Sequence, residues 1–410
     1  MNSKFTKEAK YWAQILMLPI YWFSFLIPRS KKIWLFGSTF GRRFADNPRY
    51  FYLYMNQYRR QDIRPIWLSH DKQIGRLLTE HGMDAYYYKS LKGIWYSLRG
   101  KVYIFDNYSK DINFWLSGGA LKVNLWHGIP LKKIQMDNIF DKVRHPENKR
   151  LKWKWKLRRL SDEKPSHYVL TTSDFLVPIF SSAFATKHVL TSGYPRNDML
   201  ISSDIQNVLT QCEAYNIQVI HDKCDTHGMK MVYYMPTFRE TETMFFDIMD
   251  LNRFKQSLQE HNILFCVKLH PKSKLNDKFK ELVSENILII DKDADPYVFL
   301  THADVLITDY SSIYFDYLLT GRPILFFDYD LKEYLMNSRE MYFDYEAFTP
   351  GKKVRNMDEL ITALSDVDAL VQDSEMTEFR EEIGQKVFNE RTGLASERLY
   401  QDITKVLNRE

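Results

Sequence analysis

The stretch from Asp304 to Asp328 combines a short apolar run with two serines at a predicted helix start. The run from Asp304 to Thr308 contains β-branched residues, which indicates a buried parallel strand. The segment Ile313 to Thr320 carries apolar residues at helical spacing, so Ser311 and Ser312 would lie at a helix N-terminus. Unpaired backbone N–H groups at such an end attract anions such as phosphate. A capped helix without a ligand is an equally good interpretation of this stretch alone.

A carboxylate and a helix stop follow the two serines. Asp316 comes four residues after Ser312, and therefore lies on the same helix face. Gly321-Arg322-Pro323 is expected to end the helix before a second buried strand at Ile324–Phe327.

Four other predicted strands also end in residues that can bind phosphate or transfer a proton. Leu121–Trp126 is followed by His127 and Gly128, which would expose an imidazole suited to a general base. Val189–Thr191 leads to Arg196, which could pair with a phosphate. Met231–Tyr234 ends in Met235-Pro236-Thr237-Phe238-Arg239, and Ile263–Lys268 ends in Leu269-His270-Pro271.

Each of these residues also has a simpler interpretation. A lone histidine is more often structural, and Arg196 could be a surface residue in an ordinary turn. A single cleft nevertheless explains all five strand ends together. None of them carries the paired carboxylates of a glycosidase or the acidic cluster of a magnesium site, so we expect neither a metal nor another cofactor.

The elements that would position these residues alternate between strand and helix. The 410 residues, 45% of them hydrophobic and 15% aromatic, are enough for two cores. The order predicts two doubly wound α/β domains joined by a linker helix near Asp204–Tyr215, with a helical tail from Asn356 to Glu410. Strands are predicted at Ile33–Phe36, Pro65–Leu68, Ala85–Tyr88, Val102–Phe105, Leu121–Trp126, Tyr168–Thr171, Val189–Thr191, Met231–Tyr234, Ile263–Lys268, Ile287–Ile290, Val305–Thr308 and Ile324–Phe327.

The cysteines and the charge limit the class of protein. Cys212, Cys224 and Cys266 have neither metal spacing nor a disulfide pattern, which favours a reducing compartment and gives no zinc site. The net charge of +5 is small but unevenly placed. Seven of the eleven residues in Lys149–Arg159 are basic, with Trp153 and Trp155 between them, which suggests an anionic membrane surface as a partner. A solvated helix face is the alternative.

The first 32 residues contain an uncharged stretch from Tyr11 to Ile27, flanked by lysines and arginines. We expect a helix that lies in, or partly enters, one membrane leaflet, with Trp12, Tyr21 and Trp22 at the interface. A true transmembrane span and a helix packed on the protein body remain alternatives, because 17 residues interrupted by Pro19 are at the short limit for a span.

Taken in chain order, the strand-end motifs resemble those of the CDP-glycerol glycerophosphotransferase family, whose members prime and polymerise wall teichoic acids and some bacterial capsules. The resemblance extends from about Ile33 to Pro350 and includes Gly37–Tyr50 and Met341–Gly351. The family often has threonine where this chain has Ile129, so only the backbone could act at that position. The motifs are His127-Gly128-Ile129-Pro130-Leu131-Lys132-Lys133, Gly193-Tyr194-Pro195-Arg196-Asn197-Asp198, Pro236-Thr237-Phe238-Arg239, Lys268-Leu269-His270-Pro271, and Thr308-Asp309-Tyr310-Ser311-Ser312 with Asp316.

The resemblance implies a GT-B-like fold of two facing Rossmann-type domains with a central cleft. It also implies a CDP-alcohol donor, a lipid-linked saccharide or polymer acceptor, and a place at the cytoplasmic face of a bacterial membrane, with no nucleic-acid partner. The implied divisions are a membrane-associating segment at residues 1–32, an acceptor domain at 33–203, a linker at 204–229, a donor domain at 230–385 and a C-terminal helix at 386–410 that packs back.

Carried over by position, the family's site assigns a role to each motif. His127 would deprotonate the acceptor hydroxyl, His270 would contact the pyrophosphate, and Asp316 would bind a donor hydroxyl unless it is a capping or structural carboxylate. Arg196, Lys268, a cationic His270 and the helix start at Ser311 could stabilise the leaving CMP without a metal. The implied donor-binding residues are Gly128, Ile129, Pro130, Leu131, Arg196, Pro236, Thr237, Arg239, Lys268, Leu269, Ser311, Ser312 and Asp316.

Two other functions are compatible with parts of this pattern. A nucleotide-sugar glycosyltransferase could use the same architecture, because fold alone does not select the donor. A basic membrane-binding or nucleic-acid-binding protein would explain Lys149–Arg159 but not the strand-end motifs. The sequence does not distinguish glycerol from ribitol as the alcohol, or priming from polymerisation.

Overall fold

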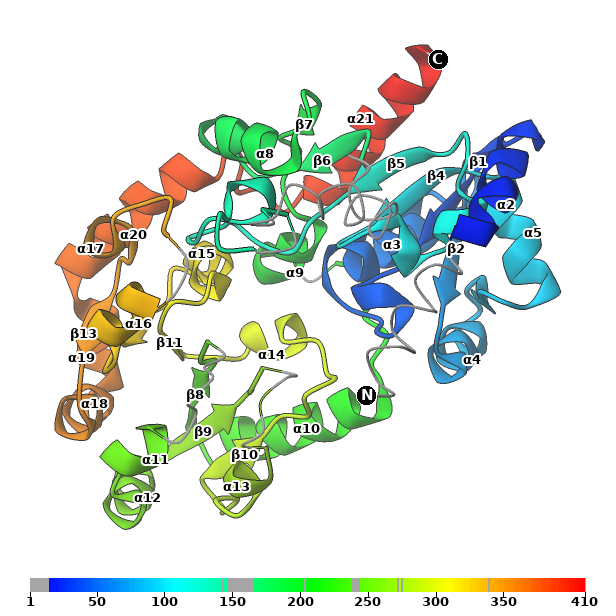
Figure 1. Cartoon of the computed structure of the whole chain (residues 1–410). Helices are drawn as coiled ribbons and strands as arrows, with labels where there is room; N and C mark the ends of the chain where they lie inside the picture. Colours follow the sequence, from blue (N-terminus) through cyan, green and yellow to red (C-terminus); the bar gives the residue numbers. More distant parts are fainter. Residues whose placement is uncertain are drawn as a thin grey trace, which may run out of the picture. The chain divides into compact units, whose positions relative to one another are not determined.

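The computed structural model describes residues 15–141, 144–145, 166–202, 204–237, 244–270, 273, 276–337 and 340–409. Within these ranges the chain forms two compact units (Figure 1). Unit 1 contains Met1–His127, Ile134–Val208 and Asn389–Glu410, and unit 2 contains Gly128–Lys133 and Leu209–Phe388. Arg239 and the basic segment Lys149–Arg159 lie outside the described residues.

Unit 1 is built on a parallel sheet whose strands follow the order β3-β2-β1-β4-β5-β6-β7. Its central strand β1 pairs on both sides, with Leu35 opposite Ile66 on one neighbour and Tyr103 on the other. These apolar side chains form a core together with Leu68, Phe105 and Ile112. The strands are β1 (Ser30–Phe36), β2 (Arg64–Ser69), β3 (Ala85–Tyr87), β4 (Gly100–Phe105), β5 (Leu121–Asn124), β6 (Tyr168–Leu170) and β7 (Val189–Leu190).

Helices connect and cover the strands of unit 1. α3 is buried from Asn47 to Met55, and the guanidinium of Arg49 within it donates to the carbonyl oxygens of Phe44 and Val208. The helices are α2 (Leu18–Phe23), α3 (Asp46–Tyr58), α4 (Lys72–Glu80), α5 (Leu91–Arg99), α8 (Val177–Phe184), α9 (Asp198–Ile201) and α21 (Ala395–Arg409). The last of these brings the end of the chain back to unit 1.

Unit 2 repeats the same arrangement with the strand order β10-β9-β8-β11-β12-β13, again all parallel. Val232, Phe265, Ile307 and Leu325 from neighbouring strands contribute to one apolar core. The strands are β8 (Lys230–Tyr234), β9 (Ile263–Val267), β10 (Ile287–Ile289), β11 (Val305–Thr308), β12 (Ile324–Phe327) and β13 (Lys352–Val354).

The helices of unit 2 lie before the first of these strands, between them and after the last one. They are α10 (Gln211–His221), α11 (Met244–Ile248), α12 (Leu251–Glu260), α13 (Asn276–Lys280), α14 (Tyr297–Leu300), α15 (Ile313–Tyr317), α16 (Leu331–Asn337), α17 (Tyr345–Phe348), α18 (Met357–Leu364), α19 (Val367–Gln372) and α20 (Ser374–Val387). The predicted fold class, two doubly wound α/β domains with a helical C-terminal region, is confirmed.

Three local predictions need correction. The helix expected at Asp204–Tyr215 begins only at Gln211, because Thr210 and Glu213 form a capping box there. The strand β13 was not predicted, since Lys352–Val354 is short and contains two lysines. The helix expected at Ile313–Thr320 is α15 followed by a 3₁₀ turn at Leu318–Thr320, and Gly321 ends it with φ of 68° as expected for a C-cap.

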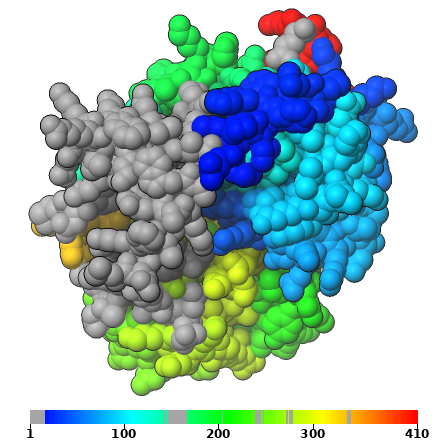
Figure 2. Space-filling view, turned by 45° about the vertical axis from the view of Figure 1, so that its right-hand side comes forward, coloured from blue at the N-terminus to red at the C-terminus, as the bar shows by residue number. Residues whose placement is uncertain are grey.

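The described part of the N-terminal segment packs one side on unit 1 and exposes the other. The Tyr21 ring stacks on Phe114 with centroids 4.8 Å apart, and the Ser24 hydroxyl accepts the Gly118 N–H. Figure 2 shows this dark blue segment at the molecular surface, beside cyan residues of the same unit. Several large apolar side chains of the segment remain exposed, namely Leu16, Ile20, Trp22, Phe23, Phe25 and Leu26.

No helix within the described ranges is both long and apolar enough to cross a bilayer.

Candidate active site

His127 follows β5 at the carboxyl edge of the unit 1 sheet. The turn that presents it is sharp, since Trp126 adopts a φ of 54°, and Asn47 of α3 holds this turn by donating to the Trp126 carbonyl at 3.0 Å. The His127 ring is exposed, and its Nδ1 lies 3.3 Å from the carbonyl oxygen of Asp106. A carbonyl can only accept, so Nδ1 carries the proton and Nε2 of the neutral ring is left to act as a base.

The carboxyl groups of Asp106 and Asp111 lie buried behind His127. Asp106 accepts the Thr39 N–H at 2.9 Å, which joins the ends of β1 and β4 where the strand order reverses. Asp111 accepts the N–H groups of Phe40, Asn107 and Tyr108. Burial raises the pKa of Asp106 well above its usual value, further helped by the Asp111 and Asp46 carboxylates, and burial raises the pKa of Asp111 to about 6. Both carboxyl groups therefore hold a proton more readily than an exposed aspartate does.

Arg196 is fully buried and forms an ion pair with Asp46 at 2.6 Å. Its guanidinium also lies over the Tyr194 ring, and its backbone N–H donates to Asn47. The predicted phosphate contact of Arg196 is not tested by this arrangement, but the structure gives the residue a different partner. Asp46 and Asn47 connect it to the turn that carries His127.

The motif that begins at His127 is divided between the two units. The chain passes from unit 1 to unit 2 between His127 and Gly128, where Gly128 has a φ of 154°, and it returns after Lys133. On unit 2, the Leu131 carbonyl accepts the Tyr342 N–H, while the Ile129 and Leu131 side chains are buried. Lys132 donates to the Tyr334 hydroxyl at 2.7 Å. Gly128 to Leu131 are thus set into unit 2 through their backbone and apolar side chains.

The remaining predicted donor residues follow β8, β9 and β11, which are neighbours in the unit 2 sheet. Pro236 and Thr237 follow β8, Lys268 to His270 follow β9, and Ser311 and Ser312 follow β11. Both carboxylate oxygens of Asp309 accept the Thr237 N–H, at 2.9 and 3.1 Å, which joins the ends of β8 and β11. The strand order reverses at this point, and open α/β sheets bind ligands there.

Lys268 and His270 differ in their surroundings. The Lys268 side chain is buried. Its ammonium group, which has three N–H donors, donates one hydrogen bond to the Lys292 carbonyl at 2.7 Å. Leu269 is buried, whereas His270 is exposed. The end of β9 is therefore followed by a buried cation, Lys268, and by an exposed imidazole, His270.

The serine pair lies at the start of α15, as predicted. Ser312 is the N-cap residue but makes no side-chain cap hydrogen bond, and both serines are partly exposed. Asp316 is fully buried and accepts the Tyr297 hydroxyl proton at 2.8 Å. The sequence left open whether Asp316 is a structural carboxylate, and its hydrogen bond to Tyr297 of α14 supports that interpretation. The contact between Asp316 and a hydroxyl of the donor stays a prediction.

Several residues at these edges were not found from the sequence. Asp46, Asp106 and Asp111 have no motif of their own, and their shared role depends on strands and loops that meet only in the fold. In unit 2, Tyr310 donates to Asp330 at 2.9 Å and stacks on Tyr334, whose ring also lies under Lys132. The one sequence feature that could have pointed to any of these residues is the position of Asp106 and Asp330 shortly after a strand.

Among the described residues, no group of three or more His, Cys, Asp or Glu side chains has the geometry to hold a metal ion. Asp309, which directly follows β11, uses its carboxylate to accept the N–H groups of Thr237 and Tyr310. The expectation of chemistry without a metal remains a prediction, to be tested with a chelator.

Comparison with known proteins gives the family directly. The chain is 29% identical over 373 residues to a teichoic acid poly(glycerol phosphate) polymerase of Bacillus spizizenii (strain ATCC 23059 / NRRL B-14472 / W23), covering 86% of this chain and 88% of the relative. It is 28% identical over 392 residues to a teichoic acid glycerol-phosphate transferase of Staphylococcus aureus (strain NCTC 8325 / PS 47), covering 92% and 94%.

The fold is similar to the solved structure of the wall teichoic acid polymerase TagF, with a TM-score of 0.72 at 21% identity, covering 100% of this chain and 99% of that one. The family model for CDP-glycerol:poly(glycerophosphate) glycerophosphotransferases matches residues 19–405. This chain therefore belongs to the CDP-glycerol:poly(glycerophosphate) glycerophosphotransferase family of transferases.

Proposed function

We propose that this protein transfers an alditol phosphate from a CDP-alcohol to a hydroxyl group and releases CMP. Glycerol phosphate is the favoured group, with ribitol phosphate as the alternative, and the acceptor is a lipid-linked saccharide or a growing polymer. The observation that carries the proposal is the arrangement of Thr237, Lys268 to His270 and Ser311 at neighbouring strand ends in unit 2. Family membership and relatives that act on glycerol phosphate support it.

The donor is proposed to bind at the point where the strand order of unit 2 reverses. The pyrophosphate would accept hydrogen bonds from the start of α15 and from the cations that follow β9, because an anion is stabilised by a helix N-terminus and by fixed positive charge. The Asp309 carboxylate does not need to contact the donor in this scheme. It holds the β8 and β11 ends in register instead.

His127 is proposed as the general base. Its Nε2 would take the proton from the acceptor hydroxyl as that oxygen bonds to the β-phosphorus, and the bond from this phosphorus to the CMP oxygen breaks. Negative charge then develops on CMP, and Lys268 and His270 would stabilise it. The carbonyl of Asp106 supports this role, because it holds the tautomer in which Nε2 is unprotonated.

We further propose that the N-terminal segment holds the protein at the cytoplasmic face of the membrane, where a cytosolic donor can meet a lipid-linked acceptor. Its exposed Trp22, Phe25 and Leu26 could enter the headgroup region, while Tyr21 and Ser24 keep the segment on unit 1. Exposed Leu91 and Trp95 of α5, together with Lys149–Arg159, are further candidates for this surface.

The decisive experiment incubates the full-length protein with CDP-glycerol or CDP-ribitol and a panel of lipid-linked acceptors. CMP release and product mass are measured together. Product with one or more added glycerol phosphates, formed with equal CMP, is expected, and product length distinguishes priming from polymerisation. Turnover of a nucleotide sugar with no turnover of either CDP-alcohol would replace the proposal with the glycosyltransferase alternative.

A further inference from the structure

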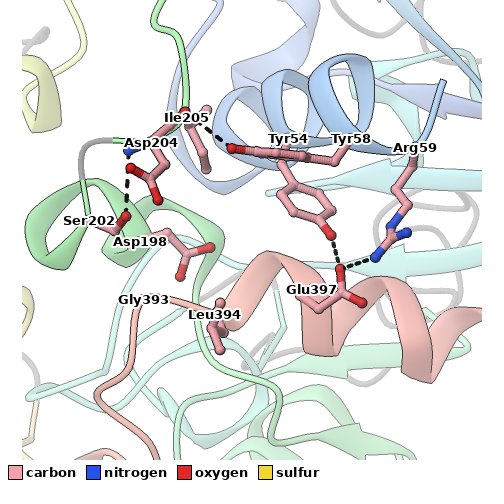
Figure 3. A pocket seen from close by; sticks show the side chains of 10 residues that line it. All are labelled: Tyr54, Tyr58, Arg59, Asp198, Ser202, Asp204, Ile205, Gly393, Leu394 and Glu397. Carbon is pink, nitrogen blue, oxygen red and sulfur yellow. Dashed lines mark hydrogen bonds and ion pairs between the residues drawn. The ribbon is translucent and has the colours of Figure 1, made fainter.

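A cavity of about 300 Å³ lies within unit 1, and none of the residues that line it is assigned to the reaction (Figure 3). It is bounded by the end of α3, the segment after α9 and the beginning of α21. Its volume is at the lower end of the roughly 300–1,000 Å³ typical of small-molecule sites, which suits one ring better than a chain. The lining residues are Tyr54, Tyr58, Arg59, Asp198, Ser202, Asp204, Ile205, Gly393, Leu394 and Glu397.

The cavity has apolar walls on two sides. Tyr54 and Tyr58 lie one helical turn apart on α3, with ring centroids 5.3 Å apart, and Ile205 and Leu394 face the same space. Figure 3 shows Tyr58 and Ile205 on one side and Leu394 with Gly393 opposite. Gly393 has a φ of 72°, and a Cβ there would lie 3.2 Å from the Ser202 Cβ, so the turn beside Leu394 is restricted to a residue without a side chain.

The polar groups of the cavity include both donors and acceptors. Glu397 accepts hydrogen bonds from the Tyr54 hydroxyl and from Arg59 NH2, and all three side chains converge in Figure 3. The Nε of Arg59 has no hydrogen-bond partner among the described residues, but protein atoms cover it, so a ligand in the cavity does not reach it. Asp204 adds an exposed carboxylate, and Ser202 adds a hydroxyl.

The charge of the lining excludes most ligands of the proposed reaction. The lining contains three carboxylates, those of Asp198, Asp204 and Glu397, and one guanidinium, that of Arg59. The guanidinium is already paired with Glu397. Asp198 is also committed, because its two oxygens accept the Ala395 and Ser396 N–H groups and cap α21. An anionic ligand such as a nucleotide or a polyol phosphate would be repelled here. An ammonium ligand would gain little, because Glu397 and Asp198 already have partners and the Asp204 carboxylate is exposed to solvent.

A neutral sugar ring satisfies all of these conditions. Its C–H faces can pack on tyrosine rings, and its hydroxyls can donate to the exposed Asp204 carboxylate and accept from the Ser202 hydroxyl. We propose that this cavity is a binding site for a neutral pyranoside, separate from the site of phosphate transfer. The segments it joins are those by which the chain leaves unit 1 after Val208 and returns at Asn389.

Two sources could supply such a ring: the saccharide of the acceptor, which rests on the proposed function, or a free sugar. The test measures binding of methyl β-D-glucopyranoside to the full-length protein by saturation-transfer NMR and calorimetry. Choline and glycerol 3-phosphate serve as the cationic and anionic comparisons. Saturable binding of the glucoside, and not of the two comparison ligands, is expected. This binding should persist in the His127→Ala variant, so the result does not depend on whether the protein catalyses transfer.

Tyr58→Ala and Leu394→Ala should each weaken glucoside binding by about tenfold, as expected for removal of a wall in a small pocket. Tyr215→Ala, which removes a still more exposed tyrosine outside the cavity, is the control and should leave binding unchanged. Thermal melting checks that the variants fold. No saturable glucoside binding, or binding that both wall variants retain, would overturn the proposal, as would tighter binding of choline or glycerol 3-phosphate.

The source of the sugar follows from the kinetics of the same variants. A rise in KM for a lipid-linked saccharide acceptor, with kcat unchanged, would identify the acceptor as the source. An unchanged KM beside weakened glucoside binding would identify a free sugar. Both results support the cavity as a pyranoside site.

Discussion

The carbonyl oxygen of Asp106 lies 3.3 Å from Nδ1 of His127, although the two residues follow different strands, β4 and β5. This hydrogen bond fixes the ring nitrogen that carries the proton and leaves Nε2 to act. The same aspartate uses its side chain to hold Thr39 at the end of β1. A catalytic role for His127 therefore depends on the position of the β4 end as well as on its own turn.

We predict that His127→Ala lowers kcat by about 10² to 10⁴, because a general base contributes in this range. Binding of CDP-glycerol, measured by calorimetry, should remain within about twofold of wild type. His81→Ala is a matched control, since His81 also bonds a backbone carbonyl through Nδ1 and is exposed. A His127→Ala protein that keeps more than half of the wild-type kcat would remove this residue from the mechanism.

Arg196→Gln should act on stability more than on donor binding. Arg196 is fully buried, whereas the side chain of its partner Asp46 is 20% exposed, so the loss should be smaller than the roughly 3 to 5 kcal/mol typical of breaking a fully buried pair. We expect a clear loss of melting temperature, with the KM for CDP-glycerol changed little in protein that remains folded. Asp46→Asn in the same background should add little further loss. A stable variant with a greatly raised KM would instead restore the phosphate contact predicted from the sequence.

Activity should survive EDTA, because cations of the protein are proposed to stabilise the leaving CMP. The measurement compares CMP release in chelator with release in added Mg²⁺. Complete loss in EDTA that Mg²⁺ reverses would show that a metal acts in the reaction. Asp309→Asn would then be the first variant to test for a metal ligand, with its effect on the Thr237 contact as the competing explanation.

Unit 2 contains a carboxyl group that should make stability depend on pH. Burial raises the pKa of Asp328 to about 6, above the value of about 3.9 for an unfolded aspartate. The folded state therefore holds this proton more tightly, so its stability falls as the pH rises from about 4 through 6 and then stays level. Asp328→Asn should raise the free energy of unfolding at pH 7.5 by roughly 1 to 3 kcal/mol, and the melting temperature should rise with it. The substitution should have little effect at pH 4.

Asp330→Asn provides the comparison for that experiment, because Asp330 is also buried near the β12 end but accepts the Tyr310 hydroxyl. Its substitution should remove a hydrogen-bond acceptor and lower the melting temperature at pH 7.5. If Asp328→Asn is destabilising to the same extent at both pH values, the burial of a charged Asp328 carboxylate is not what limits stability.

Membrane binding should depend on two distinct interactions. Replacing Leu16, Trp22 and Leu26 with serine removes exposed apolar side chains without changing Tyr21, Ser24 or Arg29, which hold the segment on unit 1. This change should weaken flotation with anionic liposomes at any salt concentration, because apolar insertion is not screened. Replacing Lys152, Lys154, Lys156, Arg158 and Arg159 with glutamine should have an effect that high salt reproduces in the wild type.

Combining both sets of substitutions tests the assignment itself. A protein that carries all eight and still floats would show that the membrane contact lies elsewhere. Exposed Leu91 and Trp95 of α5 are then the next residues to replace.

The sequence by itself determined the features that depend on local order. Apolar runs with β-branched residues identified both sheets, and turn or capping residues identified the ends at which His127, Thr237, Lys268 and Ser312 lie. The order of the motifs identified the family. These predictions succeed because a strand and the cap that follows it are encoded by a few consecutive residues.

Only the tertiary structure decided which side chains are paired and buried. Arg196 meets Asp46 across 150 residues of sequence, and Tyr297 meets Asp316 from a different helix. Motif spacing could not reveal either contact, because burial and ion pairing depend on where separate strands bring their loops. The same reason explains why the Asp106–Asp111 pair, the division of the chain after His127 and the cavity beside Tyr58 came from the fold alone.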